Sequence, residues 1–82
     1  MNSTARKMTL NDLAITDLQI SDDMLIADIN DGRRVSIPLT WFPLLSNANE
    51  DQRRNFKISP GGYGIHWPDL DEDISIKSFI NS

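Results

Sequence analysis

The dipeptide Asp31-Gly32 constrains the fold more than any other feature of this sequence. It separates two apolar segments, residues 24–30 and 33–39, and Asp-Gly is favoured in two-residue type I′ turns because both central positions need positive φ. The sequence therefore predicts a tight antiparallel hairpin whose apolar pairs share the core face. The pairs in this register are Asn30 with Arg33, Asp28 with Val35, Ile26 with Ile37, and Met24 with Leu39.

The opposite face of the hairpin carries Leu25, Ala27 and Ile29 beside Arg34 and Ser36, which is more apolar than a face in water. Two arrangements would bury this face. The first strand and the C-terminal helix of the same chain can pack on it, or a second copy can, because a symmetric dimer uses one self-complementary patch twice. Leu25, Ala27 and Ile29 are therefore a candidate dimer face, and a homodimer is one of two expectations.

Hydrophobic patterning outside the hairpin predicts two more strands and three short helices. The strands are expected over residues 13–20 and 63–67. The helices are expected over 41–46, from 47 to 54 or 55, and in a short C-terminal stretch that starts with acidic residues and carries Ile76, Phe79 and Ile80 on its apolar face. This order predicts an α+β fold, in which a three- or four-stranded antiparallel sheet packs against two or three short helices.

Local signals mark where the helices begin and where the domain starts. Thr40 is the expected N-cap of the first helix, and Asn47 with Glu50 resembles a capping box for the second. Acidic residues 71–73 suit the positive N-terminal end of the third. Residues 1–8 lack apolar periodicity and are expected to form a flexible tail, which leaves residues 9–82 as a single domain.

Charge and composition exclude several classes of protein. The 82 residues carry a net charge of −4, which argues against direct binding to nucleic acid or to anionic membranes. The chain has no cysteine, so neither a disulfide framework nor a thiolate site can form. Because no export signal or membrane-spanning run is visible, we expect a cytoplasmic protein.

His66 is the only histidine, and several acidic residues follow it closely. One imidazole with flexible carboxylates binds a divalent metal weakly, whereas zinc enzymes commonly use several such ligands. A strand histidine that packs on Trp67 or bonds an Asp is the favoured interpretation. Since no nucleophile–base set accompanies it, no catalytic, cofactor-binding or metal-binding residue is predicted, and the protein is expected not to be an enzyme.

Other notable side chains have structural explanations beside functional ones. Arg53 and Arg54 suit the C-terminal end of a helix, although they are also able to contact an acidic partner. Trp41 and Trp67 each lie within two residues of a proline and are expected to be core or rim aromatics. The Trp67-Pro68 bond is a candidate for the cis isomer.

Three runs of the sequence together resemble a known family. They are Asp31-Gly32-Arg33, residues 37–45 and residues 64–75. They resemble the bacterial domain-of-unknown-function family numbered 2442 over nearly the whole ordered chain. The resemblance implies a compact α+β fold without an established reaction, and stand-alone members are often encoded beside a second small protein, in arrangements similar to toxin–antitoxin pairs. The family's characteristic residues fall on Trp41, Pro43, Gly64, His66, Trp67, Pro68, Asp71 and Asp73.

These observations predict a non-catalytic protein-interaction or regulatory module, the antitoxin-like member of a two-protein system whose partner is a protein encoded by a neighbouring gene. An acidic inhibitor of a basic target, a nucleic-acid mimic of phage origin, is the alternative. A weak metal-dependent enzyme centred on His66 is the third hypothesis. The candidate interaction surface comprises Trp41, Pro43, Arg53, Arg54, His66, Trp67, Asp69, Asp71 and Asp73.

Overall fold

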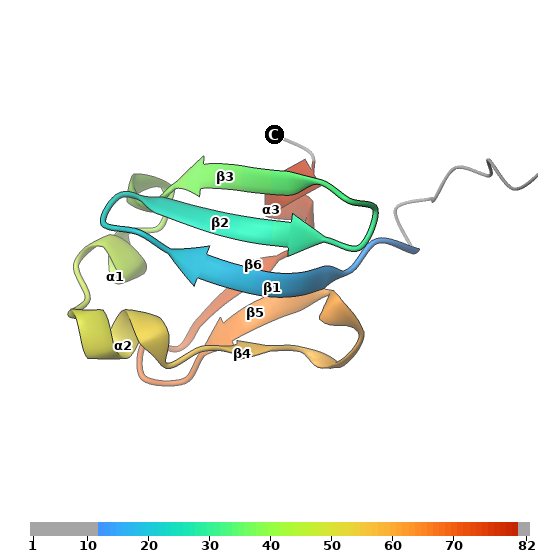
Figure 1. The fold of residues 1–82 in the computed structure, drawn as a ribbon. Helices are drawn as coiled ribbons and strands as arrows, with labels where there is room; N and C mark the ends of the chain where they lie inside the picture. The colour runs from blue at the N-terminus through green and yellow to red at the C-terminus, as the bar shows by residue number, and fades with distance from the viewer. Residues whose placement is uncertain (1–11, 81–82) are drawn as a thin grey trace, which may run out of the picture.

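The computed structural model describes residues 12–80, and its strands form two three-stranded antiparallel sheets (Figure 1). The strand order is β1-β2-β3 in the first sheet and β4-β5-β6 in the second. The strands are β1 (Ile15–Ile20), β2 (Met24–Ile29), β3 (Arg34–Pro38), β4 (Lys57–Ile58), β5 (Gly64–Trp67) and β6 (Glu72–Ser75). The predicted α+β class is confirmed, with the strands divided between two sheets instead of lying in one.

Short helices connect and flank these sheets. They are the 3-10 helices η3 (Leu39–Trp41) and η4 (Pro60–Gly62) and the α-helices α1 (Pro43–Ser46), α2 (Glu50–Arg54) and α3 (Lys77–Ile80). Helices α1 and α2 lie at one end of the molecule, where β1, β3 and β5 end, and α3 packs against β3 and β6 (Figure 1). The tail predicted at residues 1–8 lies outside the described residues.

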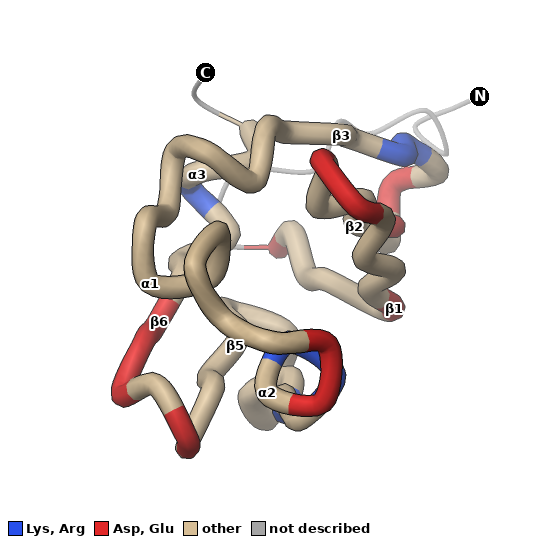
Figure 2. Tube along the Cα trace, turned by 90° about the vertical axis from the view of Figure 1, so that its left-hand side faces the viewer, with Lys and Arg blue, Asp and Glu red and all other residues tan. Residues whose placement is uncertain are grey.

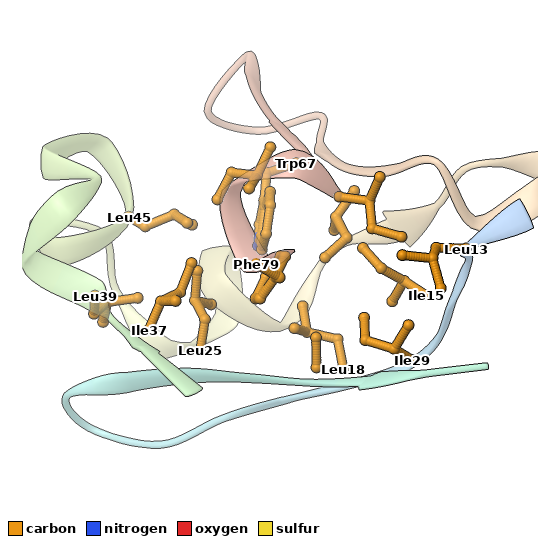
Figure 3. Packing of buried hydrophobic residues seen from close by; sticks show 14 residues of the cluster. Leu13, Ile15, Leu18, Leu25, Ile29, Ile37, Leu39, Leu45, Trp67 and Phe79 are labelled. Atoms are coloured by element: carbon orange, nitrogen blue, oxygen red, sulfur yellow. The ribbon is translucent and has the colours of Figure 1, made fainter. Parts of the chain in front are cut away.

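The hydrophobic core fills the space between the two sheets (Figure 3). Both sheets contribute to it, as do η3, α1 and α3, whereas α2 has no buried residue. Its buried residues are Leu13, Ile15, Leu18, Leu25, Ala27, Ile29, Ile37, Leu39, Leu45, Ile65, Trp67, Ile74, Ile76 and Phe79. Among the described residues, no helix is long and apolar enough to cross a membrane.

The hairpin forms as predicted, but its register differs by one residue. Leu25 lies opposite Ile37 and Ala27 lies opposite Val35. The backbone N–H of Ile29 donates to the carbonyl of Arg33 at 2.8 Å, so residues 30–32 form a three-residue loop. Gly32 has φ 99°, whereas no positive φ occurs at Asp31. This pattern is typical of a three-residue loop that closes through one left-handed glycine, and not of a type I′ turn.

The shifted register reverses the predicted core face. Apolar residues of β3 now share a face with Leu25, Ala27 and Ile29, which are 0%, 0% and 3% exposed. A register change of one residue moves a strand's partners to the other face. The candidate dimer face Leu25, Ala27 and Ile29 is therefore wrong: the rest of this chain covers it. The outer face carries the partly exposed Met24 and Ile26 instead.

The side chain of Asn30 explains why the loop contains a third residue. Its Oδ1 accepts a hydrogen bond from the N–H of Ala14 at 2.9 Å, and its Nδ2 donates to the carbonyl of Asp12 at 2.9 Å. The N–H of Asn30 also donates to the carbonyl of Ala14 at 2.9 Å. Asn30 thus pairs with the segment before β1 and not with Arg33 across the hairpin.

Four other local features differ from what the sequence suggested. Thr40 lies inside η3, whose N-cap is Pro38. The capping box lies two residues later than expected: the Oδ1 of Asn49 accepts from the N–H of Gln52, and the side chain of Gln52 accepts from the N–H of Asn49. Residues 71–73 form a turn and the start of β6, and not the start of a helix. The Trp67-Pro68 bond is trans.

Candidate functional site

One end of the molecule gathers most of the candidate surface residues. We call it the helical end and define it as residues 21–23, 39–54 and 68–72, which comprise the β1–β2 turn, η3, α1, α2, the β5–β6 turn and the first residue of β6. The strands that lead into these segments all reach the same end of the two sheets (Figure 1). Figure 2 looks directly at this end.

The side chain of Arg53 holds the helical end together. Its Nε donates to the carbonyl of Leu45 at 2.9 Å, and its Nη2 donates to the carbonyl of Ser46 at 2.7 Å. These carbonyls belong to the last turn of α1, where such groups lack partners within the helix. The carbonyl of Arg53 accepts from the indole Nε1 of Trp67 at 2.8 Å. One residue therefore connects α1, α2 and β5.

Substituting Arg53 with alanine is expected to reduce the free energy of unfolding by about 1–3 kcal/mol, because two charge-assisted hydrogen bonds to α1 are lost. Urea denaturation measures this change. Arg54→Ala is the matched control, since the guanidinium of Arg54 pairs with Glu50 at 3.2 Å and both side chains are 72% exposed. The control should change stability by less than about 0.5 kcal/mol. Equal effects of the two substitutions would contradict the connecting role of Arg53.

Two large apolar side chains project from this rigid end. Trp41 on η3 is 53% exposed and Leu44 on α1 is 52% exposed, whereas Leu45 is fully buried and Phe42 packs against the core. Of the two positions expected for Trp41, core or rim, the structure therefore shows the rim. The exposed Pro43 lies between Trp41 and Leu44. The helical end thus presents an apolar contact area to solvent.

Carboxylates lie at the same end of the molecule as this apolar area. Figure 2 shows them at the β1–β2 turn, at the start of α2 and between β5 and β6. The seven are Asp22, Asp23, Glu50, Asp51, Asp69, Asp71 and Glu72. The basic residues of the helical end are Arg53 and Arg54. Within the described chain, Glu50 alone among the seven is ion-paired, so negative charge is left unbalanced here.

Two ion pairs lie at the opposite end of the first sheet. Asp28 pairs with Arg34 at 2.7 Å and Asp31 pairs with Arg33 at 2.7 Å. The hydrogen bond from each arginine holds the pKa of its partner carboxyl below the ordinary value. Among the described residues, acidic side chains therefore exceed basic ones by more at the helical end than at the hairpin loop.

His66 lies on the outer face of the second sheet, between two charged neighbours. Its Nδ1 is 2.7 Å from Oδ1 of Asp73 on β6, and Lys57 is its partner on β4. The predicted hydrogen bond between His66 and an Asp is thus present. The described residues contain no group of three or more His, Cys, Asp or Glu side chains that could hold a metal ion.

The structure divides the predicted interaction surface into three parts. Trp41, Pro43, Arg53, Arg54, Asp69 and Asp71 lie together at the helical end. His66 and Asp73 form a separate pair on the outer face of the second sheet. Trp67 is 0% exposed, so its assignment to the surface is wrong, because its ring fills the core beside Phe56 with a centroid separation of 6.0 Å.

Leu44 and five of the seven carboxylates were missed by sequence reasoning. Asp22 and Asp23 are turn formers in the sequence, Glu50 and Asp51 suit a helix start, and Glu72 was assigned with residues 71–73 to the start of the third helix. Leu44 and Leu45 are adjacent apolar residues, and only the rotational position of α1 determines which of them is buried. A surface of this kind is assembled from distant turns and has no local sequence motif.

Comparison with known proteins relates the chain to a family and a fold. Residues 15–82 match the family described as "Protein of unknown function (DUF2442)". The crystal structure of a protein of unknown function from Rhodospirillum rubrum is similar, with a TM-score of 0.70 and 27% identity, over 84% of this chain and 86% of that one. The solution structure of an uncharacterised protein from Chromobacterium violaceum is also similar, with a TM-score of 0.67 and 20% identity, over 83% of this chain and 64% of that one. No curated protein matches.

Proposed function

This chain belongs to the DUF2442 family of proteins of unknown function, and from that membership and the geometry above we propose that it is a non-catalytic protein-interaction module that binds through its helical end. The single observation that carries the proposal is the exposed Trp41 and Leu44 on a rigid, acidic end of the molecule. We propose a cytoplasmic setting for this role, on the basis of the cysteine-free sequence.

An exposed tryptophan on a fixed support is typical of a binding hot spot. Tryptophan is enriched among the residues that dominate interface energies, and such residues are commonly enclosed by polar neighbours that exclude water. Trp41 fits this description in two respects. Its support is fixed, because Arg53 ties α1 to α2, and carboxylates lie at the same end of the molecule as the apolar area. Little conformational entropy is lost when a preformed surface of this kind binds.

Charge indicates the chemistry of the partner. The unbalanced carboxylates at the helical end favour a protein whose contact surface is basic and contains an apolar recess for Trp41. The family resemblance adds the expectation that this partner is encoded by a neighbouring gene and that the chain regulates it, as an antitoxin regulates a toxin. Long-range attraction between the two surfaces accelerates association and weakens as salt screens it.

The product of the neighbouring gene is the probe for this proposal. We expect it to co-purify with the protein after co-expression, and Trp41→Ala to weaken the calorimetrically measured affinity by about thirtyfold or more, as a loss of 2 kcal/mol implies. Tyr63→Ala is the matched control, because Tyr63 is 59% exposed beside η4, away from the helical end. The control should change affinity by less than about twofold.

Two results would contradict this function. One is a protein that elutes alone and neither binds nor neutralises the neighbouring product. The other is equal weakening of the complex by Trp41→Ala and Tyr63→Ala, which would remove the helical end from the interface.

The clustered carboxylates also favour a second candidate function, an acidic inhibitor that occupies the nucleic-acid groove of a basic protein. Seven carboxylates at one end resemble a phosphate backbone more closely than scattered ones would. Competition separates the two functions. An inhibitor displaces DNA from its target and loses affinity when Glu50 and Asp51 are replaced by the neutral amides, whereas a complex anchored by Trp41 tolerates those changes better.

A further inference from the structure

The hairpin loop carries a reactive sequence that the proposed function does not use. In an Asp-Gly pair, the main-chain nitrogen of the glycine can attack the side-chain carboxyl carbon of the aspartate, because no Cβ obstructs the approach. Apart from Gly32 itself and its neighbours Asp31 and Arg33, no atom of the described residues lies within 4 Å of the position where a Cβ would stand, so the rest of the fold does not cover Gly32 on that side. Residues 31 and 32 are both exposed in the loop.

The products of this reaction are defined by its bonds. A bond forms between N of Gly32 and Cγ of Asp31, and the carboxyl oxygen leaves as water together with the amide proton. Water then opens the cyclic imide. Attack at the main-chain carbonyl of Asp31 gives isoaspartate, in which the chain continues through Cγ, and attack at Cγ restores aspartate. Water is released and consumed in equal amounts, so the net change is an isomerisation.

Arg33 hydrogen-bonds and ion-pairs with the Asp31 carboxylate, the group that must react. Its backbone N–H donates to Oδ1 of Asp31 at 3.1 Å, its Nε donates to Oδ2 at 2.8 Å, and its Nη2 lies 2.7 Å from Oδ2. The side chain of Asp31 remains only 20% exposed beneath it. The N–H of Gly32 is also engaged, since it donates to the carbonyl of Ile29 at 3.0 Å.

We propose that Asp31-Gly32 is a latent isoaspartate site and that the guanidinium of Arg33 protects it in the folded protein. A neutral carboxyl group loses its oxygen as water, whereas an ionised carboxylate would have to lose oxide, which is a much poorer leaving group. The carboxylate of Asp31, which Arg33 holds ionised, therefore reacts slowly. The same contact keeps the pKa of Asp31 below its ordinary value, which agrees with this account. Isoaspartate would add a methylene to the loop and disrupt the Ile29–Arg33 closure of the hairpin.

The test measures isoaspartate at residue 31 by peptide mapping and mass spectrometry after incubation at mildly acidic pH and 37 °C. We expect Arg33→Gln to accelerate its formation by about threefold or more, because the neutral carboxyl becomes more abundant. Arg34→Gln is the control, since it removes the neighbouring ion pair with Asp28 and leaves Asp31 untouched. Wild type in urea should approach the rate of the Arg33→Gln protein.

Each other outcome would overturn the proposal. Equal rates in Arg33→Gln and wild type would show that Arg33 gives no protection. Equal acceleration by Arg33→Gln and Arg34→Gln would assign the effect to a loosened hairpin. Should Arg33→Gln fail to fold, wild type alone decides: a native rate equal to its rate in urea contradicts protection by the folded loop.

Discussion

Ile29→Asp is expected to unfold the protein. Ile29 is 3% exposed at the end of β2, and its side chain lies in the core between the two sheets (Figure 3). An unpaired carboxylate there is destabilising by several kcal/mol, and the lost apolar contacts add to this. Since small domains are stable by about 5–15 kcal/mol, the sum is comparable with the whole free energy of unfolding. Circular dichroism at room temperature should report the loss of structure.

Ile26→Asp is the matched control for this substitution. Ile26 lies on the same strand and faces outward, partly exposed, with Ser36 and Gln19 as its cross-strand partners. We expect it to reduce stability by about 1 kcal/mol or less. The opposite order, with Ile26→Asp unfolded and Ile29→Asp folded, would support the hairpin register predicted from a two-residue turn. A wild-type dimer that Ile29→Asp converts into a folded monomer would support the predicted dimer face at Leu25, Ala27 and Ile29.

Trp67→Ala is expected to reduce the free energy of unfolding by about 3–5 kcal/mol, because it leaves a large cavity and removes a hydrogen bond. Trp67 is 0% exposed, and its indole donates to the carbonyl of Arg53, which connects β5 to α2. Thermal unfolding measures the change. Trp67→Phe keeps a ring in the core and should recover part of the loss.

Trp41→Ala provides the control on the other tryptophan. Because Trp41 is 53% exposed, its truncation should change stability by less than about 1 kcal/mol. The two substitutions therefore separate folding from binding: Trp67→Ala should destabilise the domain, whereas Trp41→Ala should weaken only the complex. Comparable destabilisation by both would contradict the assignment of Trp41 to a contact surface.

The hairpin could be predicted from sequence, but its register could not. Asp31-Gly32 marked the turn because Gly32 needs positive φ, which is a local property. Register depended on Asn30, whose side chain bonds to Asp12 and Ala14. Those contacts span 16 and 18 residues and have no local signature. A one-residue error in the loop was sufficient to assign the core face incorrectly.

The second sheet was only partly predictable for a related reason. β5 has a buried Ile65 and Trp67 and gave a clear strand signal. β4 has two residues, and β6 begins with Glu72 and Asp73, which suggested the start of a helix. Acidic residues are tolerated in β6 because Asp73 faces solvent beside His66 while Ile74 supplies the core contact.

The candidate site shows the same limit. Trp41 and Trp67 have similar local sequences, each near a proline, yet one is exposed and the other is fully buried. Burial follows from tertiary position: β5 is the central strand of the second sheet and buries Trp67 in the core, whereas η3 lies at the end of the sheets and leaves Trp41 exposed (Figure 1). Six of the nine predicted surface residues lie at the helical end, because polar turn residues on several strands meet where those strands end.

The most direct test of the helical end as a binding surface is chemical-shift mapping of isotope-labelled protein titrated with the neighbouring gene's product. The two indole N–H signals report separate environments. Our account predicts that the signal of Trp41 and the amides of Leu44, Asp22 and Glu50 move, while the indole signal of Trp67 changes little. Perturbations confined to the outer face of β1-β2-β3, around Ile26, or no perturbation at all, would contradict it.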